Sequence, residues 1–283
     1  MLEVYFKSNQ EVISFCESLF YYHKEIDLKW KTNEEWGYHL TFTGKKLADN
    51  EIQAVERSMV DVFLRHRLSE LINEIITRKY YYTNADEIER ISELTHIIFR
   101  EIDEGVYQTV KKTSPSQLLL SLFAANMKNT NIIHFDSICQ FQLTMFKDQL
   151  VHHIGLAIDE FKQEEDHQTF IDMLRKYIDK RESTHLEVHI IQGDSFIFYH
   201  PTGEQFSTLA LRNIVHNEPL YIVGLDVEEL NLAPLIAMSP QKIYLYGDNP
   251  SEPKTMTVIN VFQEKVVFQP ISNFPFPRYL DMK

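Results

Sequence analysis

The chain has 283 residues, of which 44% are hydrophobic and 12% aromatic, and these fractions exclude a disordered or fibrous protein. It carries 41 acidic against 28 basic side chains, so its formal charge of −13 opposes binding to nucleic acid or to an anionic membrane surface. The acidity is not confined to one region, because residues 185–283 alone hold 6 basic and 11 acidic side chains. We therefore expect no nucleic-acid partner.

The chain shows no targeting or membrane signal. The N-terminus, Met1-Leu2-Glu3, lacks the basic region and the apolar run of a signal peptide. The most apolar stretch, 118–125, is far shorter than the ~20 residues that a membrane span requires. Cys16 and Cys139 are too few for a four-cysteine metal site and suggest no disulfide framework. The sequence thus predicts a cytoplasmic protein without membrane insertion.

The first elements form a small β-α-β-β unit. Alternation of Leu2, Val4 and Phe6 indicates a strand, and the following Ser8-Asn9-Gln10-Glu11 has the capping-box pattern that begins a helix. Two extended segments follow, at 28–31 and 38–43.

The middle of the chain is predicted to be helical, because Pro115 is the only proline before Pro201 and proline breaks helices. Apolar residues at spacings of three and four predict one long helix over 50–80. Asn84 and Ser114-Pro115 are start signals for two further helices.

A last helical pattern runs over 136–181 and should divide near Glu164–Asp166, where polar residues interrupt its apolar face. Arg65-His66-Arg67 is the main basic cluster in this region, and we expect it to be a solvated helix surface.

The last hundred residues mix strands and helices. Residues 186–190 and 196–199 alternate around Gln192-Gly193-Asp194, which indicates a β-hairpin with His189 and Tyr199 as cross-strand neighbours. Asp226-Val227-Glu228-Glu229 is expected to cap a helix that ends before Pro240 and is kinked at Pro234. Further along, the sequence predicts a strand at 242–246, a helix at 252–262, a strand at 266–268 and an irregular tail containing Pro270, Pro275 and Pro277.

The predicted fold is therefore α+β in three regions. These are an N-terminal β-α-β-β unit at 1–48, a helical region of long-helix bundle type at 49–183, and a C-terminal mixed α/β module at 184–283 that starts with the hairpin and ends in the Pro-rich tail.

No catalytic motif is present. The eight glycines form neither a G-x-G-x-x-G nor a Walker arrangement, and there is no G-x-S-x-G or H-E-x-x-H sequence. Dinucleotide binding, P-loop hydrolysis, α/β-hydrolase chemistry and zincin chemistry are disfavoured. We assign no catalytic residue and no cofactor.

One metal site remains as an alternative. Glu93 and His96, and likewise Glu164 and His167, have the Glu-x-x-His spacing that places two ligands on one helix face in carboxylate-bridged bundles. Twelve histidines and 26 glutamates produce this spacing about once by chance. Moreover, His96 lies off the apolar face of its helix and should point to solvent, whereas His167 could face inward.

Several blocks carry a family resemblance. They are Ile133-His134-Phe135, Gly155-Leu156-Ala157-Ile158-Asp159-Glu160-Phe161, the segment from Phe170 to Ile178, Val188-His189-Ile190, the segment from Leu235 to Ile243, and the segment from Val261 to Val266. In these blocks the chain resembles the YtxC-like family, described as sporulation proteins of endospore-forming Firmicutes. The resemblance implies a place in sporulation and brings no catalytic residue with it.

The leading hypothesis is a sporulation-associated cytoplasmic protein of unknown biochemical activity that acts through contacts with unknown protein partners. The hairpin and the Pro-rich tail are the expected contact surfaces, because edges and loops commonly carry recognition. The alternative is a metal-dependent enzyme with a carboxylate/histidine site in the helical region. A nucleic-acid binder is the least favoured class.

Overall fold

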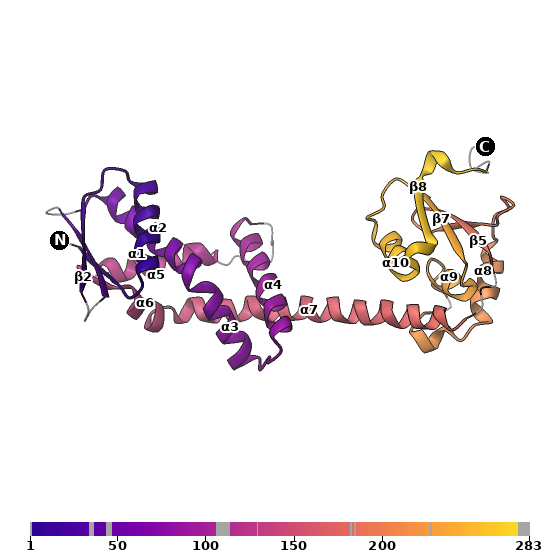
Figure 1. Cartoon of the computed structure of the whole chain (residues 1–283), viewed down its shortest axis with the longest axis horizontal. Coiled ribbons are helices and arrows are strands. Elements are labelled where there is room, and N and C mark those ends of the chain that lie inside the picture. The colour runs from indigo at the N-terminus through magenta and orange to yellow at the C-terminus, as the bar shows by residue number, and fades with distance from the viewer. Residues whose placement is uncertain are drawn as a thin grey trace. The chain divides into compact units, whose positions relative to one another are not determined.

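The computed structural model describes residues 2–33, 37–43, 47–105, 114–128, 130–181, 183, 185–226 and 228–276. It has the predicted α+β class, with helices and two four-stranded sheets (Figure 1). The chain divides into two compact units, Met1–Gln163 and Glu164–Lys283. This division has a single boundary, where the sequence analysis placed two, at 48/49 and 183/184.

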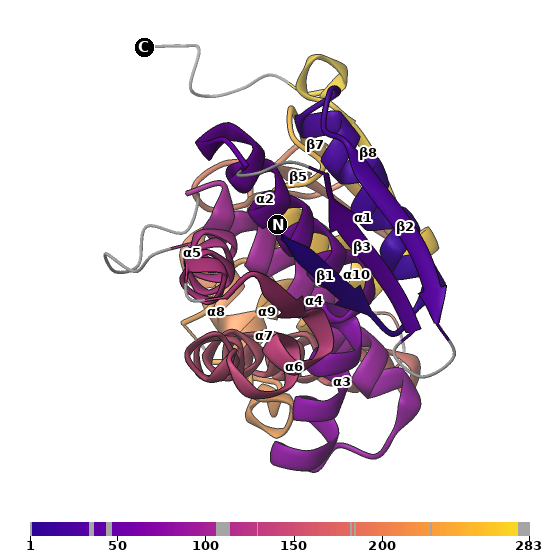
Figure 2. The same ribbon diagram turned by 90° about the vertical axis from the view of Figure 1, so that its left-hand side faces the viewer.

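The N-terminal unit contains the predicted β-α-β-β arrangement, completed by a strand from far along the chain. Its elements are β1 (Glu3–Phe6), α1 (Asn9–Tyr22), β2 (Leu28–Asn33) and β3 (Gly37–Phe42), and β4 (Ile132–His134) is the fourth strand. The sheet order is β2-β3-β1-β4, with β1 antiparallel to β3 and parallel to β4. Figure 2 shows β1, β2 and β3 side by side. Because β4 pairs with β1, the sheet and the helical region share one core.

In the described part of this unit, five helices and the first part of a sixth follow the β-α-β-β arrangement. They are α2 (Asp49–His66), α3 (Leu68–Lys79), α4 (Ala85–Asp103), α5 (Pro115–Lys128), α6 (Phe135–Phe141) and α7 (Thr144–Asp179). The two predicted start signals are confirmed. Asn84 Oδ1 accepts hydrogen bonds from the backbone N–H groups of Asp86 and Glu87, and Ser114 Oγ accepts one from Gln117.

Three details of this region were predicted wrongly. The expected helix over 50–80 is two helices, because the backbone turns at Arg67 (φ −118°, ψ −26°). The capping box at Ser8 does not form, since the Glu11 side chain is buried and pairs with Arg67 instead of reaching back to the helix start. The expected division near Glu164–Asp166 is also absent, because α7 continues through it.

The polar stretch of α7 at residues 162–169 marks the boundary between the two compact units rather than a break in the helix. Side chains at 162–169 are all exposed, and the boundary between the two compact units falls at Gln163/Glu164. The loss of the apolar face therefore marks the place where α7 leaves one core and joins the next. The break in the helical pattern lies earlier, between α6 and α7.

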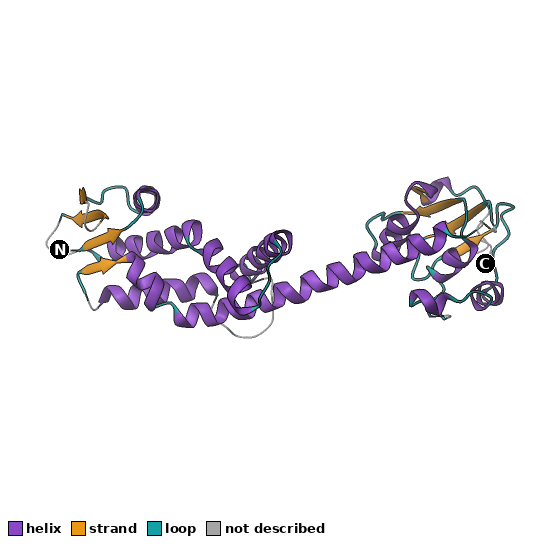
Figure 3. Cartoon of the chain, turned by 60° about the horizontal axis from the view of Figure 1, so that its bottom comes forward, coloured by secondary structure: helices purple, strands orange, loops and turns teal. Residues whose placement is uncertain are grey.

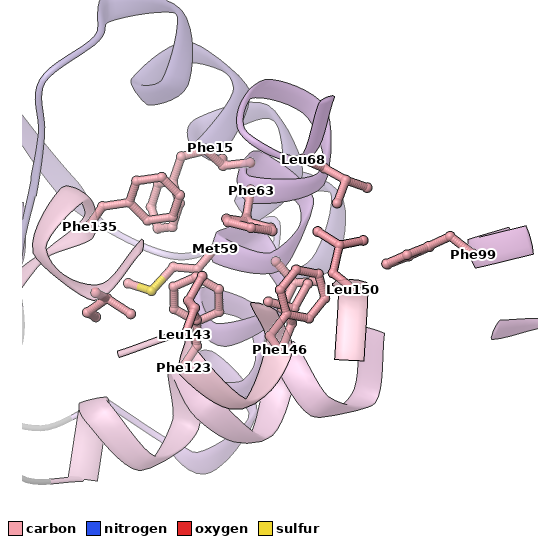
Figure 4. Packing of buried hydrophobic residues seen from close by; sticks show 14 of the residues in the cluster. Phe15, Met59, Phe63, Leu68, Phe99, Phe123, Phe135, Leu143, Phe146 and Leu150 are labelled. Atoms are coloured by element: carbon pink, nitrogen blue, oxygen red, sulfur yellow. The ribbon is translucent and has the colours of Figure 1, made fainter. Parts of the chain in front are cut away.

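Aromatic rings fill the core of the N-terminal unit (Figure 4). Phe123 from α5 stacks on Phe135 from α6 with ring centroids 5.8 Å apart, and Phe63 from α2 meets Phe146 from α7 edge-on at 5.4 Å. All four rings are at most 2% exposed. Burial of rings of this size contributes about 1.5–3 kcal/mol each, so this cluster stabilises the packing of α2, α5, α6 and α7.

The C-terminal unit contains the second sheet, in the order β6-β5-β7-β8 (strands orange in Figure 3). Its strands are β5 (Glu187–Ile191), β6 (Ile197–Tyr199), β7 (Lys242–Gly247) and β8 (Val266–Pro270). The hairpin β5–β6 is confirmed, with His189 paired to Tyr199, and β5, β7 and β8 are parallel. One sheet face is buried against the second part of α7 and against α8 (Thr208–His216), α9 (Ala233–Met238) and α10 (Pro253–Phe262).

The helix expected from Asp226 towards Pro240 is wrong in its first half. The Glu229 carboxylate accepts hydrogen bonds from the backbone N–H groups of Asn231, Leu232 and Ala233, and so it caps a helix that begins only at Ala233. Pro234 lies in the first turn of α9, where its missing N–H costs nothing, and it causes no kink. Helix α8 had no counterpart among the predictions.

Three short 3₁₀ turns complete the unit: η1 (Leu220–Val223), η2 (Gln263–Lys265) and η3 (Ile271–Asn273). The last lies within the tail that was expected to be irregular. Pro277 and the residues after it lie outside the described part of the chain.

Candidate functional site

The outward face of the C-terminal sheet carries four rings, which we call the aromatic face: His189 of β5, Tyr199 of β6, and Tyr244 and Tyr246 of β7. Side chains alternate along a strand, so Val188, Ile190, Ile243 and Leu245 point into the core and the rings point away from it. The register places His189 between Tyr199 and Tyr244, its partners on the two neighbouring strands.

His189 is the centre of the aromatic face. Its ring stacks on Tyr244 at 4.9 Å and lies nearly parallel to Tyr246 at 5.8 Å, and its Nδ1 is 3.0 Å from the Tyr246 hydroxyl. Burial lowers the pKa of His189, and the nearby Glu187 opposes this effect. Burial also raises the pKa of Tyr246. Both shifts favour the neutral forms of the imidazole and the phenol in this pair.

The start of the tail covers part of the aromatic face. Phe274 meets Tyr199 at 4.9 Å and Tyr246 at 5.2 Å, and Phe276 meets His189 edge-on at 5.1 Å. The turn that follows β6 contains Gly203, at φ +88°, where a Cβ would lie 2.6 Å from the Phe276 ring. The two surfaces that the sequence analysis expected to make external contacts thus touch each other in this structure.

In the described part of the chain, Tyr244 is the one ring of the aromatic face that is not fully buried. The Lys242 ammonium lies 5.2 Å from the centre of the Tyr244 ring, on the same outward side of β7. Exposed ring surface beside a cation can bind apolar and aromatic side chains, because it combines a large flat contact area with a positive charge.

Sequence reasoning identified His189 and Tyr199 but missed the role of Tyr244 and Tyr246. The available signal was the spacing Lys242-Ile243-Tyr244-Leu245-Tyr246, in which every second residue is large, polar-tipped and outward-facing. The sequence contains no signal that Phe274 and Phe276 cover the aromatic face, because this contact depends on where the tail folds back.

The four residues of the predicted metal site fall into the two compact units: Glu93 and His96 in the N-terminal unit, Glu164 and His167 in the C-terminal one. His96 does not point freely to solvent, since it is partly buried and its Nε2 lies 3.0 Å from Ser69 Oγ. Burial, with Arg100 in second place, lowers its pKa. His167 is exposed rather than inward-facing.

Glu93 and His96 line a groove between α3 and α4 together with Glu89. Glu93 pairs with Arg90 at 3.0 Å. In the described parts of the chain, no three His, Cys, Asp or Glu side chains are grouped closely enough to hold a metal ion.

A charged cluster that the sequence did not reveal lies in the N-terminal unit. Arg67, between α2 and α3, binds Glu11 of α1 through Nε and Asp136 of α6 at 2.9 Å. Arg67 was expected to be part of a solvated surface, but its side chain is 30% exposed and is the counter-ion of Glu11, which is only 2% exposed. This cluster ties three helical elements together, which is a structural role.

The fold and these sites define a two-unit α+β protein whose most distinctive surface is a sheet face of stacked rings. The chain belongs to the YtxC-like family, whose family model matches residues 53–267. The match begins within α2 and ends within β8, so it includes parts of both compact units, whereas β1 to β3 and the tail lie outside it.

The chain is 31% identical over 225 residues to an uncharacterised protein, YtxC, of Bacillus subtilis strain 168, covering 78% of each chain. No solved structure matches significantly. No helix in the described parts of the chain is both long enough and apolar enough to cross a bilayer.

Proposed function

We propose that this chain is a sporulation-associated protein that acts in the cytoplasm by binding another protein, and that the aromatic face is its contact surface. The single observation that carries the proposal is that stacked rings face outward from the C-terminal sheet and that, among the described residues, Phe274 and Phe276 cover three of them but leave Tyr244 partly exposed. Aromatic side chains are enriched in protein interfaces because each supplies a large rigid contact area.

Two further points support it. The sequence carries none of the common catalytic motifs, and the family resemblance points to sporulation. The metal-dependent enzyme with Glu93, His96, Glu164 and His167 remains the alternative, and elemental analysis of untagged protein for iron, manganese and zinc separates the two proposals.

The test is site-specific photo-crosslinking in sporulating cells of the organism that encodes the chain. A photoreactive phenylalanine analogue replaces Tyr244 on the aromatic face or, as the matched control, Tyr21, which is 80% exposed in the N-terminal unit. We expect one defined protein adduct from position 244 and none from position 21. The adduct should disappear when Lys242→Glu is added, and the spore count should fall in the same variant.

Equal adducts from both positions, or a normal spore count in a strain that lacks the protein, would contradict the proposal.

A further inference from the structure

A second surface of the C-terminal unit lies on its helical layer. The last turns of α7 and the 3₁₀ turn η1 form the sides of a shallow groove of about 500 Å³. Ile171, Leu174 and Ile178 of α7 point into the core, whereas Met173, Lys176 and Tyr177 line the groove. This groove is separate from the aromatic face, which lies on the other side of the sheet.

The apolar part of the groove is exposed. Met173 is 37% and Ile222 is 60% exposed, and Tyr177 lies one helical turn after Met173. Tyr221, next to Ile222 in η1, is 78% exposed. Neighbouring apolar side chains that remain open to water in this way are typical of binding surfaces.

The rim of the groove is basic. Lys176 and Lys180 are exposed and lie one turn apart on α7. Within the described residues, neither lysine has an ion-pair partner. The only acidic side chain in the lining, Asp172, is already bound by Arg175 at 3.2 Å and by Gln168 at 3.0 Å.

This local charge is opposite to that of the molecule, whose net charge is −13. The positive charge of the rim attracts acidic groups to the groove, although the protein as a whole is negatively charged. Met173 and Tyr177 are four residues apart on α7, and so are Lys176 and Lys180 at its C-terminal end. Each pair is therefore separated by a rise of about 6 Å, which matches the separation of side chains at positions i and i+4 on a bound helix.

We propose that this groove binds an amphipathic helix of a partner protein, with apolar side chains packed on Met173, Tyr177 and Ile222 and with acidic side chains paired to Lys176 and Lys180. The partner is thus defined by an apolar stripe bordered by Asp or Glu. The contact is independent of the aromatic face, so either surface can fail its test without affecting the other.

The test uses three fluorescein-labelled 16-residue peptides and the full-length protein. The first peptide has leucines at helical spacing bordered by glutamates, the second has lysines in place of the glutamates, and the third has the composition of the first in an order without an apolar stripe. Fluorescence anisotropy at 50 mM NaCl should show binding of the first peptide only, weakened severalfold at 500 mM NaCl because the lysine pairs are exposed.

Two variants assign the binding to the groove. Lys176→Glu combined with Lys180→Glu, and separately Ile222→Asp, should each weaken binding at least tenfold. Lys162→Glu, at an exposed position of α7 in the N-terminal unit, and Leu209→Asp, at a leucine that is 70% exposed on α8, are the matched controls and should leave it unchanged. Circular dichroism checks that each variant is folded.

Equal affinity for the acidic and basic peptides, equal weakening by the control variants, or no binding up to 1 mM peptide would each overturn the proposal. Tyr244→Arg should leave the peptide affinity unchanged. A loss of affinity in that variant would place the peptide on the aromatic face and would likewise overturn the assignment to the groove.

Discussion

Arg67 donates through its Nε–H to Glu11, a carboxylate that is only 2% exposed and whose second oxygen has no hydrogen-bond partner among the described residues. Removal of one member of a buried ion pair leaves the other charge uncompensated, which typically costs 3–5 kcal/mol. We expect Arg67→Met to lower the free energy of unfolding of the N-terminal unit by about that amount. Hydrogen exchange of α2 peptides across a urea series measures it.

The control is Arg65→Met. Arg65 pairs with Glu17 at 3.3 Å, but both side chains are more than half exposed, so the loss should be below about 1 kcal/mol. The double variant Glu11→Leu/Arg67→Met should be less damaged than Arg67→Met alone. Equal losses at positions 65 and 67 would show that the cluster contributes no more than a surface pair.

Gly203 provides a way to release the tail. A Cβ at this position would lie 2.6 Å from the Phe276 ring, so Gly203→Ala should displace the ring and speed hydrogen exchange of residues 271–276. Gly224→Ala is the matched control, since Gly224 has a similar φ of +72° but no atom within 4 Å of the new methyl group. Alanine at a positive φ causes a backbone strain of about 1 kcal/mol in both variants, but only Gly203→Ala should expose the tail.

The stability of the C-terminal unit should fall as the pH is lowered. Burial lowers the pKa of His189 in the folded state, so below the unfolded value of about 6.5 the unfolded chain binds more protons than the folded one. The contribution of His189 to the free energy of unfolding is complete above about pH 6.5. It is lost as the pH falls from about 6.5 towards the pKa of His189 in the folded state.

His185, whose pKa is also lowered by burial, adds to the same trend. Urea midpoints between pH 7.5 and pH 5 should therefore decrease, and His189→Phe should flatten the decrease while the exposed His216→Gln should not. An unchanged slope in the His189 variant would exclude this histidine as the source.

Both thiols should react slowly in the folded protein. Burial raises the pKa of Cys16 to about 11 and that of Cys139 to about 12. Thiolate is the reactive species, so at pH 8 alkylation by iodoacetamide should be at least two orders of magnitude slower than for a free cysteine. The rate should recover in 8 M urea. Rapid alkylation of either cysteine without denaturant would contradict the burial that raises these values.

Local signals in the sequence were sufficient where a residue acts on its own neighbours. Asn84 caps α4, and Ser114-Pro115 begins α5, because each interaction extends over three residues. The pairing of Arg67 at the break between α2 and α3 could not be predicted in this way, since its partners Glu11 and Asp136 are 56 and 69 residues distant. Glu229 gave a misleading signal, because its carboxylate caps the helix that follows it rather than a helix that contains it.

In the candidate sites, too, local contacts could be predicted from the sequence and long-range contacts could not. Alternation along two strands brought His189 and Tyr199 together correctly, because the hairpin is local. The cover formed by Phe274 and Phe276 depends on a contact between the tail and strands that precede it by more than 70 residues, such as β5 and β6. The groove on α7 requires η1, a 3₁₀ turn whose four residues carry no periodic pattern.

The parallel pairing of β1 with β4 has a consequence for the order of folding. Val4 lies opposite Ile133, so the second edge of the first strand stays unpaired until almost half of the chain has left the ribosome. Closure of so long a loop is slow compared with the formation of the helices inside it. During synthesis the helices should form first, and the N-terminal sheet, although it comes first in the chain, should be among the last parts of its unit to close.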